Sequence, residues 1–94
     1  MFGLFRRQDR HFKDDGNFLL ARVRTDRNGE EIDVRLSKTS EMSSQGGGYF
    51  VRKVLLGPKS FDQAVLEVTT NRAHKVLRYS VEGGSLVPVS EWRS

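Results

Sequence analysis

The stretch from Arg22 to Leu36, RVRTDRNGEEIDVRL, contains the strongest hairpin signal in the chain. Asn28-Gly29 favours a two-residue type I′ loop, because both central residues of that turn need a positive φ. With these two residues as the loop, Val23 lies opposite Val34 and one face of the hairpin is almost entirely apolar. The other pairs predicted on that face are Arg27–Glu30, Thr25–Ile32 and Ala21–Leu36. A shift of one residue would bring a carboxylate into this face, so the first register is preferred.

The same register decides which charges meet on the other face of the hairpin. Arg24 lies opposite Asp33, which is a favourable cross-strand pair. Arg22 lies opposite Arg35, and like charges directly opposite each other destabilise a sheet. The hairpin is therefore predicted to gather three guanidinium groups on one outward face.

Further strands are predicted downstream of this hairpin. The polar, glycine-rich stretch from Ser37 to Gly48 is typical of a mobile loop. Tyr49 to Pro58, YFVRKVLLGP, has apolar residues on both faces and predicts a central strand that ends at Gly57-Pro58. Near the C-terminus, LVPV predicts a short edge strand, because a proline cannot donate a hydrogen bond to a ladder. Trp92 is expected to close one end of the core.

The segment from Lys59 to Thr70, KSFDQAVLEVTT, fits two structures. Ser60 and Gln63 form a capping-box pattern that favours a helix, whereas the β-branched run VLEVTT favours a strand. We expect the strand, after one helical turn at most, in a hairpin whose loop runs from Asn71 to His74. The pairs predicted for it are Thr70–Lys75, Val68–Leu77, Leu66–Tyr79 and Ala64–Val81 on one face, and Glu67–Arg78 on the other.

These elements predict a mainly β protein with a single small domain. The chain of 94 residues is long enough for one modest core. We expect residues 18–94 to form five or six short antiparallel strands in a meander, with residues 1–17 as a basic and apolar N-terminal arm. Such a sheet either curls into a small barrel of SH3-like size or is half-covered by one short helix.

The composition excludes several classes of site. The chain has no cysteine, so it forms no disulfide or thiolate metal site. No apolar run approaches the roughly 18 residues of a membrane span, and we expect a cytoplasmic protein. The two histidines, His11 and His74, have no nucleophile close in sequence, and SSQGGGYF lacks the lysine of a phosphate-binding loop. We therefore expect no enzyme activity, no cofactor and no metal.

Two surfaces are candidates for binding. The first is the arginine face of Arg22, Arg24 and Arg35, which Arg52 or Lys53 would join if the third strand paired with the second. The net charge of +4, with eleven arginines among sixteen basic residues, permits an anionic ligand there, although an ordinary solvated face has the same composition.

The second candidate is the apolar arm, Phe2, Leu4 and Phe5. It suits a groove on a partner, contact with a membrane surface, or a return onto the sheet. From both surfaces together, the sequence predicts a non-enzymatic binding module with a protein partner. The alternative is binding of single-stranded RNA or DNA through the arginine face.

Overall fold

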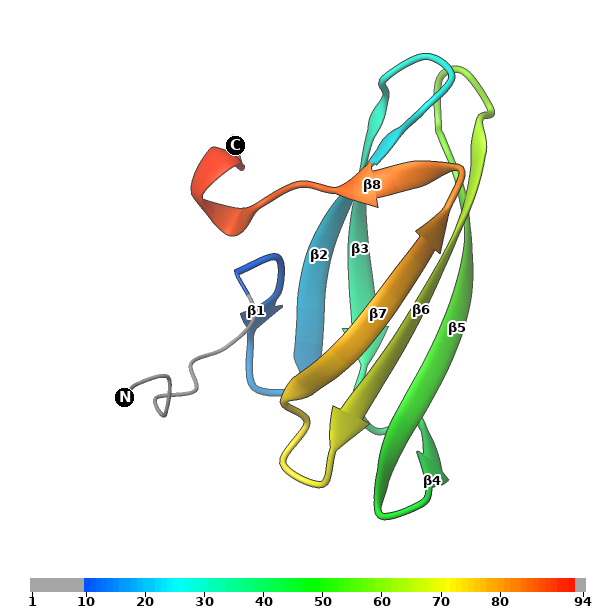
Figure 1. Cartoon of the computed structure of the whole chain (residues 1–94). Helices are drawn as coiled ribbons and strands as arrows, with labels where there is room; N and C mark the ends of the chain where they lie inside the picture. Colours follow the sequence, from blue (N-terminus) through cyan, green and yellow to red (C-terminus); the bar gives the residue numbers. More distant parts are fainter. Residues whose placement is uncertain (1–9, 93–94) are drawn as a thin grey trace.

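The structure is a computed structural model that describes residues 10–92, and it consists of two antiparallel sheets packed face to face (Figure 1). Sheet A contains β1 (Lys13–Asp14), β2 (Phe18–Thr25), β3 (Glu31–Ser37) and β8 (Gly84–Leu86). Sheet B contains β4 (Ser43–Gln45), β5 (Gly48–Leu56), β6 (Gln63–Asn71) and β7 (Val76–Glu82). The predicted mainly β, single small domain is confirmed. The sheets do not close into a barrel, and the only helix within residues 10–92 is a 3₁₀ turn at Val89–Glu91.

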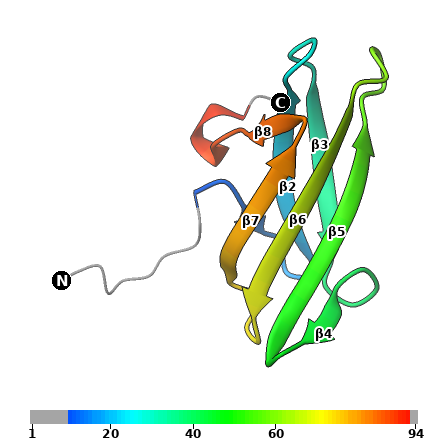
Figure 2. The ribbon, with the colours of Figure 1, turned by 45° about the vertical axis from the view of Figure 1, so that its right-hand side comes forward.

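The chain passes between the two sheets at the corner formed by β7 and β8. After Gly83 the chain leaves sheet B, and β8 pairs with the end of β2, with Val23 opposite Leu86. β1 pairs with the start of the same strand, where Leu19 lies opposite Asp14. The view in Figure 2 shows β2 and β3 as one layer behind the layer of β5, β6 and β7.

The core lies between the inner faces of the two sheets. Alternate residues of each long strand are buried, and each buried Val or Leu side chain contributes about 1.5–3 kcal/mol. The buried apolar residues of the core are Phe12, Leu19, Ala21, Val23, Ile32, Val34, Leu36, Val51, Leu55, Ala64, Leu66 and Val68. Phe12 and β1 precede Phe18, so the packed part of the chain includes residues that the sequence places in the arm.

The first hairpin has the predicted faces, but its predicted register is wrong by two residues. Val23 pairs with Ile32, so the loop has four residues, 26–29, rather than two. Gly29 has a positive φ, 69°, as predicted, but Asn28 does not have a positive φ. The prediction of a type I′ turn is therefore wrong. The cause is a distant contact, because Asn28 is hydrogen-bonded to the Asp62 carboxylate from a different loop.

A two-residue loop with positive φ at both positions does occur, at Gly46-Gly47, where φ is 57° and 87°. It joins β4 to β5 and is compatible with a type I′ turn. At the other end of the predicted mobile loop, the Glu41 amide and side chain both bond to the Ser37 backbone. Most of the stretch from Ser37 to Gly48 is therefore hydrogen-bonded structure rather than a loop without contacts.

The second hairpin is confirmed, and β6 is a strand rather than a helix. Its register is again displaced by two residues, so that Val68 pairs with Tyr79 instead of Leu77. The loop before β7 has three residues and ends with His74 in the left-handed region, at φ 63°. A register irregularity then leaves Leu77 60% exposed. A turn that ends in a left-handed residue typically carries such a bulge.

Two smaller expectations also differ from the structure. β5 has neighbours on both sides only over Gly48–Phe50, so it is not a central strand along its full length. The last strand, β8, ends before Pro88. Trp92 does not close the core: its Nε1 donates to the Val87 carbonyl at 2.9 Å, and its ring lies 5.5 Å from the Arg22 guanidinium on the outside of sheet A.

Candidate interaction surface

Two loops lie side by side at one end of the molecule, at the top of Figure 1: the β2–β3 loop (residues 26–29, with Glu30 directly after it) and the β5–β6 loop (57–62). Asp62 extends from the second loop to the first and is buried, with 7% of its surface exposed. Its carboxylate accepts three hydrogen bonds. The donors are the Thr25 hydroxyl at 2.8 Å, the Asn28 backbone N–H at 3.0 Å and the Asn28 side-chain amide at 2.8 Å.

Glu30 makes the reverse connection, from the first loop to the second. Its carboxylate accepts hydrogen bonds from the backbone amides of Lys59 and Ser60, each at 3.0 Å, and from the Ser60 hydroxyl at 2.6 Å. We call the reciprocal pair of Glu30 and Asp62 the loop brace. Each loop is thus held by a carboxylate from the other.

The pKa values of both carboxyl groups in the loop brace are lowered. The Ser60 hydroxyl and amide lower the pKa of Glu30. Burial by itself raises the pKa of Asp62, but the hydrogen bonds from Thr25 and Asn28 outweigh it, and the net pKa is lowered. Both groups are therefore ionised acceptors at neutral pH.

The braced β5–β6 loop carries Phe61, a large apolar side chain that is 70% exposed. Its backbone is in the left-handed region at φ 62°, a conformation that costs about 1–3 kcal/mol for a residue with a side chain. The loop closes on itself, because the Phe61 amide donates to the Gly57 carbonyl at 3.0 Å and the Gly57 amide donates to the Asp62 carbonyl at 2.8 Å. The fold thus holds an exposed aromatic residue in a strained backbone conformation.

A shallow depression lies beside Phe61. Its other walls include Asp26, Arg27, Gln63 and Gly83, so polar groups line the depression together with the ring. Asp26 and Arg27 are exposed. We call Phe61 and this polar rim the loop-end surface.

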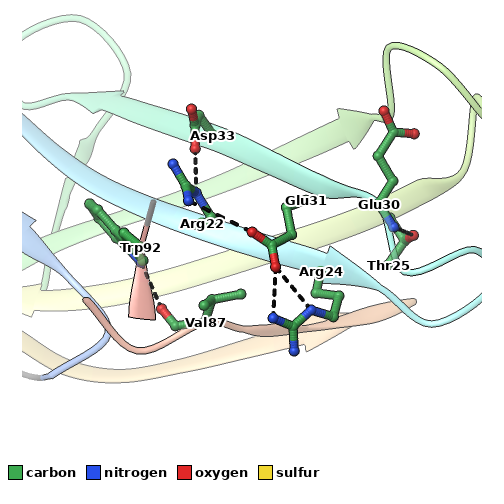
Figure 3. Close-up of polar contacts among 8 residues, drawn as sticks. All are labelled: Arg22, Arg24, Thr25, Glu30, Glu31, Asp33, Val87 and Trp92. Atoms are coloured by element: carbon green, nitrogen blue, oxygen red, sulfur yellow. Dashed lines mark hydrogen bonds and ion pairs between the residues drawn. The ribbon is translucent and has the colours of Figure 1, made fainter. Parts of the chain in front are cut away.

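On the arginine face predicted from the sequence, carboxylates pair with two of the three hairpin guanidinium groups, those of Arg22 and Arg24. Arg22, Arg24 and Arg35 all lie on the outside of sheet A. Arg22 Nε lies 2.6 Å from an Asp33 oxygen, and Arg24 Nη2 lies 2.7 Å from a Glu31 oxygen (Figure 3). A second nitrogen of Arg22 lies 3.7 Å from Glu31. An anionic ligand would have to compete with these carboxylates.

Arg35 does not face Arg22, and the predicted like-charge pair is wrong. The shifted register places Arg35 opposite Leu20, and its guanidinium lies 4.4 Å from the centre of the Phe18 ring. Arg22 instead lies opposite Asp33.

Arg52 and Lys53 lie in sheet B, because the third strand does not pair with the second. Arg52 lies 3.4 Å from Glu67, and Lys53 bonds to Glu41 at 2.5 Å and to the Arg35 carbonyl at 3.3 Å. These two residues therefore do not extend the arginine face.

The remaining candidates are the apolar arm and the two histidines. Phe2, Leu4 and Phe5 lie outside the described residues. The His11 ring meets Tyr79 edge-on, and the His74 ring stacks on Tyr49 with centroids 4.3 Å apart. Between residues 10 and 92, no three or more histidine, aspartate or glutamate side chains are close enough to hold a metal ion. No helix in the same range is long and apolar enough to cross a membrane.

Comparison of the chain with protein-family models, with curated proteins and with solved structures finds no match. The candidate site therefore depends on the geometry alone.

The loop-end surface was not found from the sequence. The sequence predicted a strand in this segment after one helical turn at most, and neither structure marked Phe61 as exposed. The available signal was an aromatic residue between a Gly57-Pro58 break and a strand start, in a segment too short for a helix. Phenylalanine does not favour the left-handed region, so the residue type did not indicate the backbone conformation at position 61.

Proposed function

We propose that this domain is a non-enzymatic protein-binding module that inserts Phe61 into an apolar pocket of its partner. The observation that carries the proposal is the exposed, left-handed Phe61 on a braced loop. Backbone strain at an exposed position is typical of functional sites, because the rest of the fold must hold the residue there. An aromatic side chain with a polar rim is also the usual composition of an interaction hot spot.

The loop brace supports the proposal through preorganisation. A flexible loop loses conformational entropy when it binds, which weakens affinity, whereas a loop that is already fixed loses little. Glu30 and Asp62 together accept six hydrogen bonds across the two loops. The loop backbone that carries Phe61 is thereby held in place before any partner arrives.

Binding of single-stranded nucleic acid is the weaker candidate. Asp33 and Glu31 already neutralise Arg22 and Arg24 at hydrogen-bonding distance. A polyanion at the arginine face would lose part of its electrostatic gain in displacing these two carboxylates.

The test compares capture of binding proteins from nuclease-treated lysate of the native cell by three forms of the domain. Phe61→Asn removes the ring but suits the left-handed backbone, so the loop keeps its shape. Leu77→Asn is the matched control, because Leu77 is a similarly exposed apolar residue on β7. The proposal predicts a partner that the wild type and Leu77→Asn retain and Phe61→Asn loses. Equal recovery of every protein by all three forms would contradict it.

A further inference from the structure

One edge of sheet B is open along the second half of β5, which Figure 2 shows at the border of the sheet. β4 covers this edge only over Gly48–Phe50. The two-residue loop makes Gln45 and Gly48 a hydrogen-bonded pair, and backbone groups then alternate between the two sides of β5. The N–H and C=O groups of Arg52, Val54 and Leu56 therefore point toward the open edge, where residues 10–92 supply no partner strand.

The side chains at this edge are largely apolar. Val54 and Leu56 are 53% and 58% exposed on the outer face of sheet B. The free edge of β3 is different, because its exposed side chains are Glu31, Asp33 and Arg35, and charge discourages the addition of another strand. The β5 edge has only Arg52 as a charged outward neighbour, and this residue is paired with Glu67.

The β5 edge is complementary to itself. If two copies pair antiparallel with Val54 on the two-fold axis, Val54 meets Val54 of the second copy and Arg52 meets Leu56 of the second copy. The two-fold axis generates the Arg52–Leu56 pair twice, which gives three pairs with Val54–Val54. All three pairs join residues whose backbone groups face the edge, so each pair exchanges two hydrogen bonds. On the inner face Lys53 lies opposite Leu55 of the second copy, and no like charges meet.

The two neighbouring registers of the β5–β5 pair are less favourable. A two-fold axis at Lys53 places two lysines opposite each other, and it also needs the Phe50 position that Ser43 of β4 already occupies. An axis at Leu55 places Arg52 opposite Pro58 of the second copy, which has no N–H group to donate. The geometry thus selects Val54 as the centre.

We propose that two copies of this chain associate through their β5 edges, with Val54 on the two-fold axis, into one sheet that continues from β7 of one copy to β7 of the other. Phe61 takes no part in these pairs, so the inference is independent of the proposed function. The interface is short, five residues from each copy, and it belongs to the class of weak, concentration-dependent associations.

The test is sedimentation velocity over a range of concentrations. The wild type is expected to shift from a mass of 10.7 kDa toward twice that value as its concentration rises. Val54→Lys places two positive charges at the axis and should abolish the shift. Val65→Lys is the matched control, since Val65 lies beside Val54 on the outer face but on β6, away from the edge. This variant should keep the wild-type shift.

A mixing experiment separates the proposed pairing from any other association. Val54→Glu alone should remain a monomer, and a mixture of Val54→Lys with Val54→Glu should recover the dimer, because opposite charges then meet at the axis. Circular dichroism and thermal melts of each variant verify that the monomer is folded. A wild type that stays monomeric, a Val54→Lys variant that dimerises like the wild type, or a mixture that fails to recover the dimer would each overturn the proposal. Loss of a partner by Phe61→Asn would still support the proposed function in all three cases.

Discussion

Asp62 binds the backbone and side chain of Asn28 across 34 positions of sequence, and this contact determines the shape of the first hairpin. It joins the four-residue β2–β3 loop to the β5–β6 loop. In the opposite direction, the Glu30 carboxylate accepts hydrogen bonds from Ser60 of the β5–β6 loop. The same two carboxylates therefore fix the register of one hairpin and the position of Phe61.

The loop brace should be a stability element as well as a positioning element. Asp62→Asn replaces an acceptor-only carboxylate with an amide that accepts through one oxygen only, so at least one donor from Thr25 or Asn28 loses its partner. We expect a lower thermal midpoint for Asp62→Asn and for Glu30→Gln. Asp33→Asn is the control, because Asp33 is a largely exposed ion-pair partner and such pairs contribute little. Equal midpoints for all four proteins would show that the brace has no energetic role.

The lowered pKa values predict acid sensitivity. A carboxyl group whose pKa is lower in the folded state stabilises the fold above its unfolded pKa, and the stabilisation is lost as the pH falls through the folded value. The ordinary values are 4.5 for Glu30 and 3.8 for Asp62, so stability should decline as the pH falls below about 4.5. Denaturant unfolding at several pH values should show a shallower decline for the double variant Glu30→Gln with Asp62→Asn. An unchanged slope would mean that other carboxylates dominate the acid transition.

Gly29 is the position where the β2–β3 loop needs a residue that tolerates a positive φ. Its φ is 69°, and a Cβ added there would meet nothing within 4 Å, so a substitution would add backbone strain without a clash. Gly29→Val should cost more than about 1 kcal/mol, because a β-branched residue is strongly disfavoured in this region. Gly29→Asn should cost less, since asparagine tolerates it. A wild-type midpoint for Gly29→Val would contradict the observed loop conformation.

Arg22 should stabilise the domain rather than destabilise it. The expected repulsion with Arg35 is absent, and Arg22 instead contacts Asp33, Glu31 and the ring of Trp92. We predict that Arg22→Ser lowers the free energy of unfolding by up to about 1 kcal/mol, the usual range for such pairs. Arg78→Ser, on the outside of sheet B, is a control of the same charge change. A more stable Arg22→Ser protein would favour the original like-charge interpretation.

Much of the fold followed from residue patterns, and the limits of that reasoning have physical causes. Alternation with period two assigned Val23 and Val34 to the core correctly, because the buried face does not change when the register moves by two residues. The register itself depended on loop length, and loop length depended on Asp62 in one hairpin and on the left-handed His74 in the other. The Asp62 contact joins residues 34 positions apart, and the left-handed conformation of His74 is a backbone feature that hydrophobic alternation does not indicate.

The candidate site was predicted less well than the fold. Arg22, Arg24 and Arg35 lie on the outside of sheet A, whereas Arg52 and Lys53 lie in the other sheet. The register error of two residues replaced the expected neighbour of Arg22, Arg35, with Asp33. The strand interpretation of the segment from Lys59 to Thr70 did not indicate that Phe61 is exposed, because its exposure depends on how two loops meet. Patterns within one element do not contain that information.

The most direct measurement of the central claim is site-specific photo-crosslinking at position 61 in the native cell. A photoreactive phenylalanine analogue at position 61 should form a covalent adduct with one defined protein, and the same analogue at Leu77 should not. The Asp62→Asn substitution should weaken the adduct at position 61 by loosening the loop. The absence of any protein adduct at position 61, or identical adducts at both positions, would contradict the role of Phe61 as the contact with a protein partner.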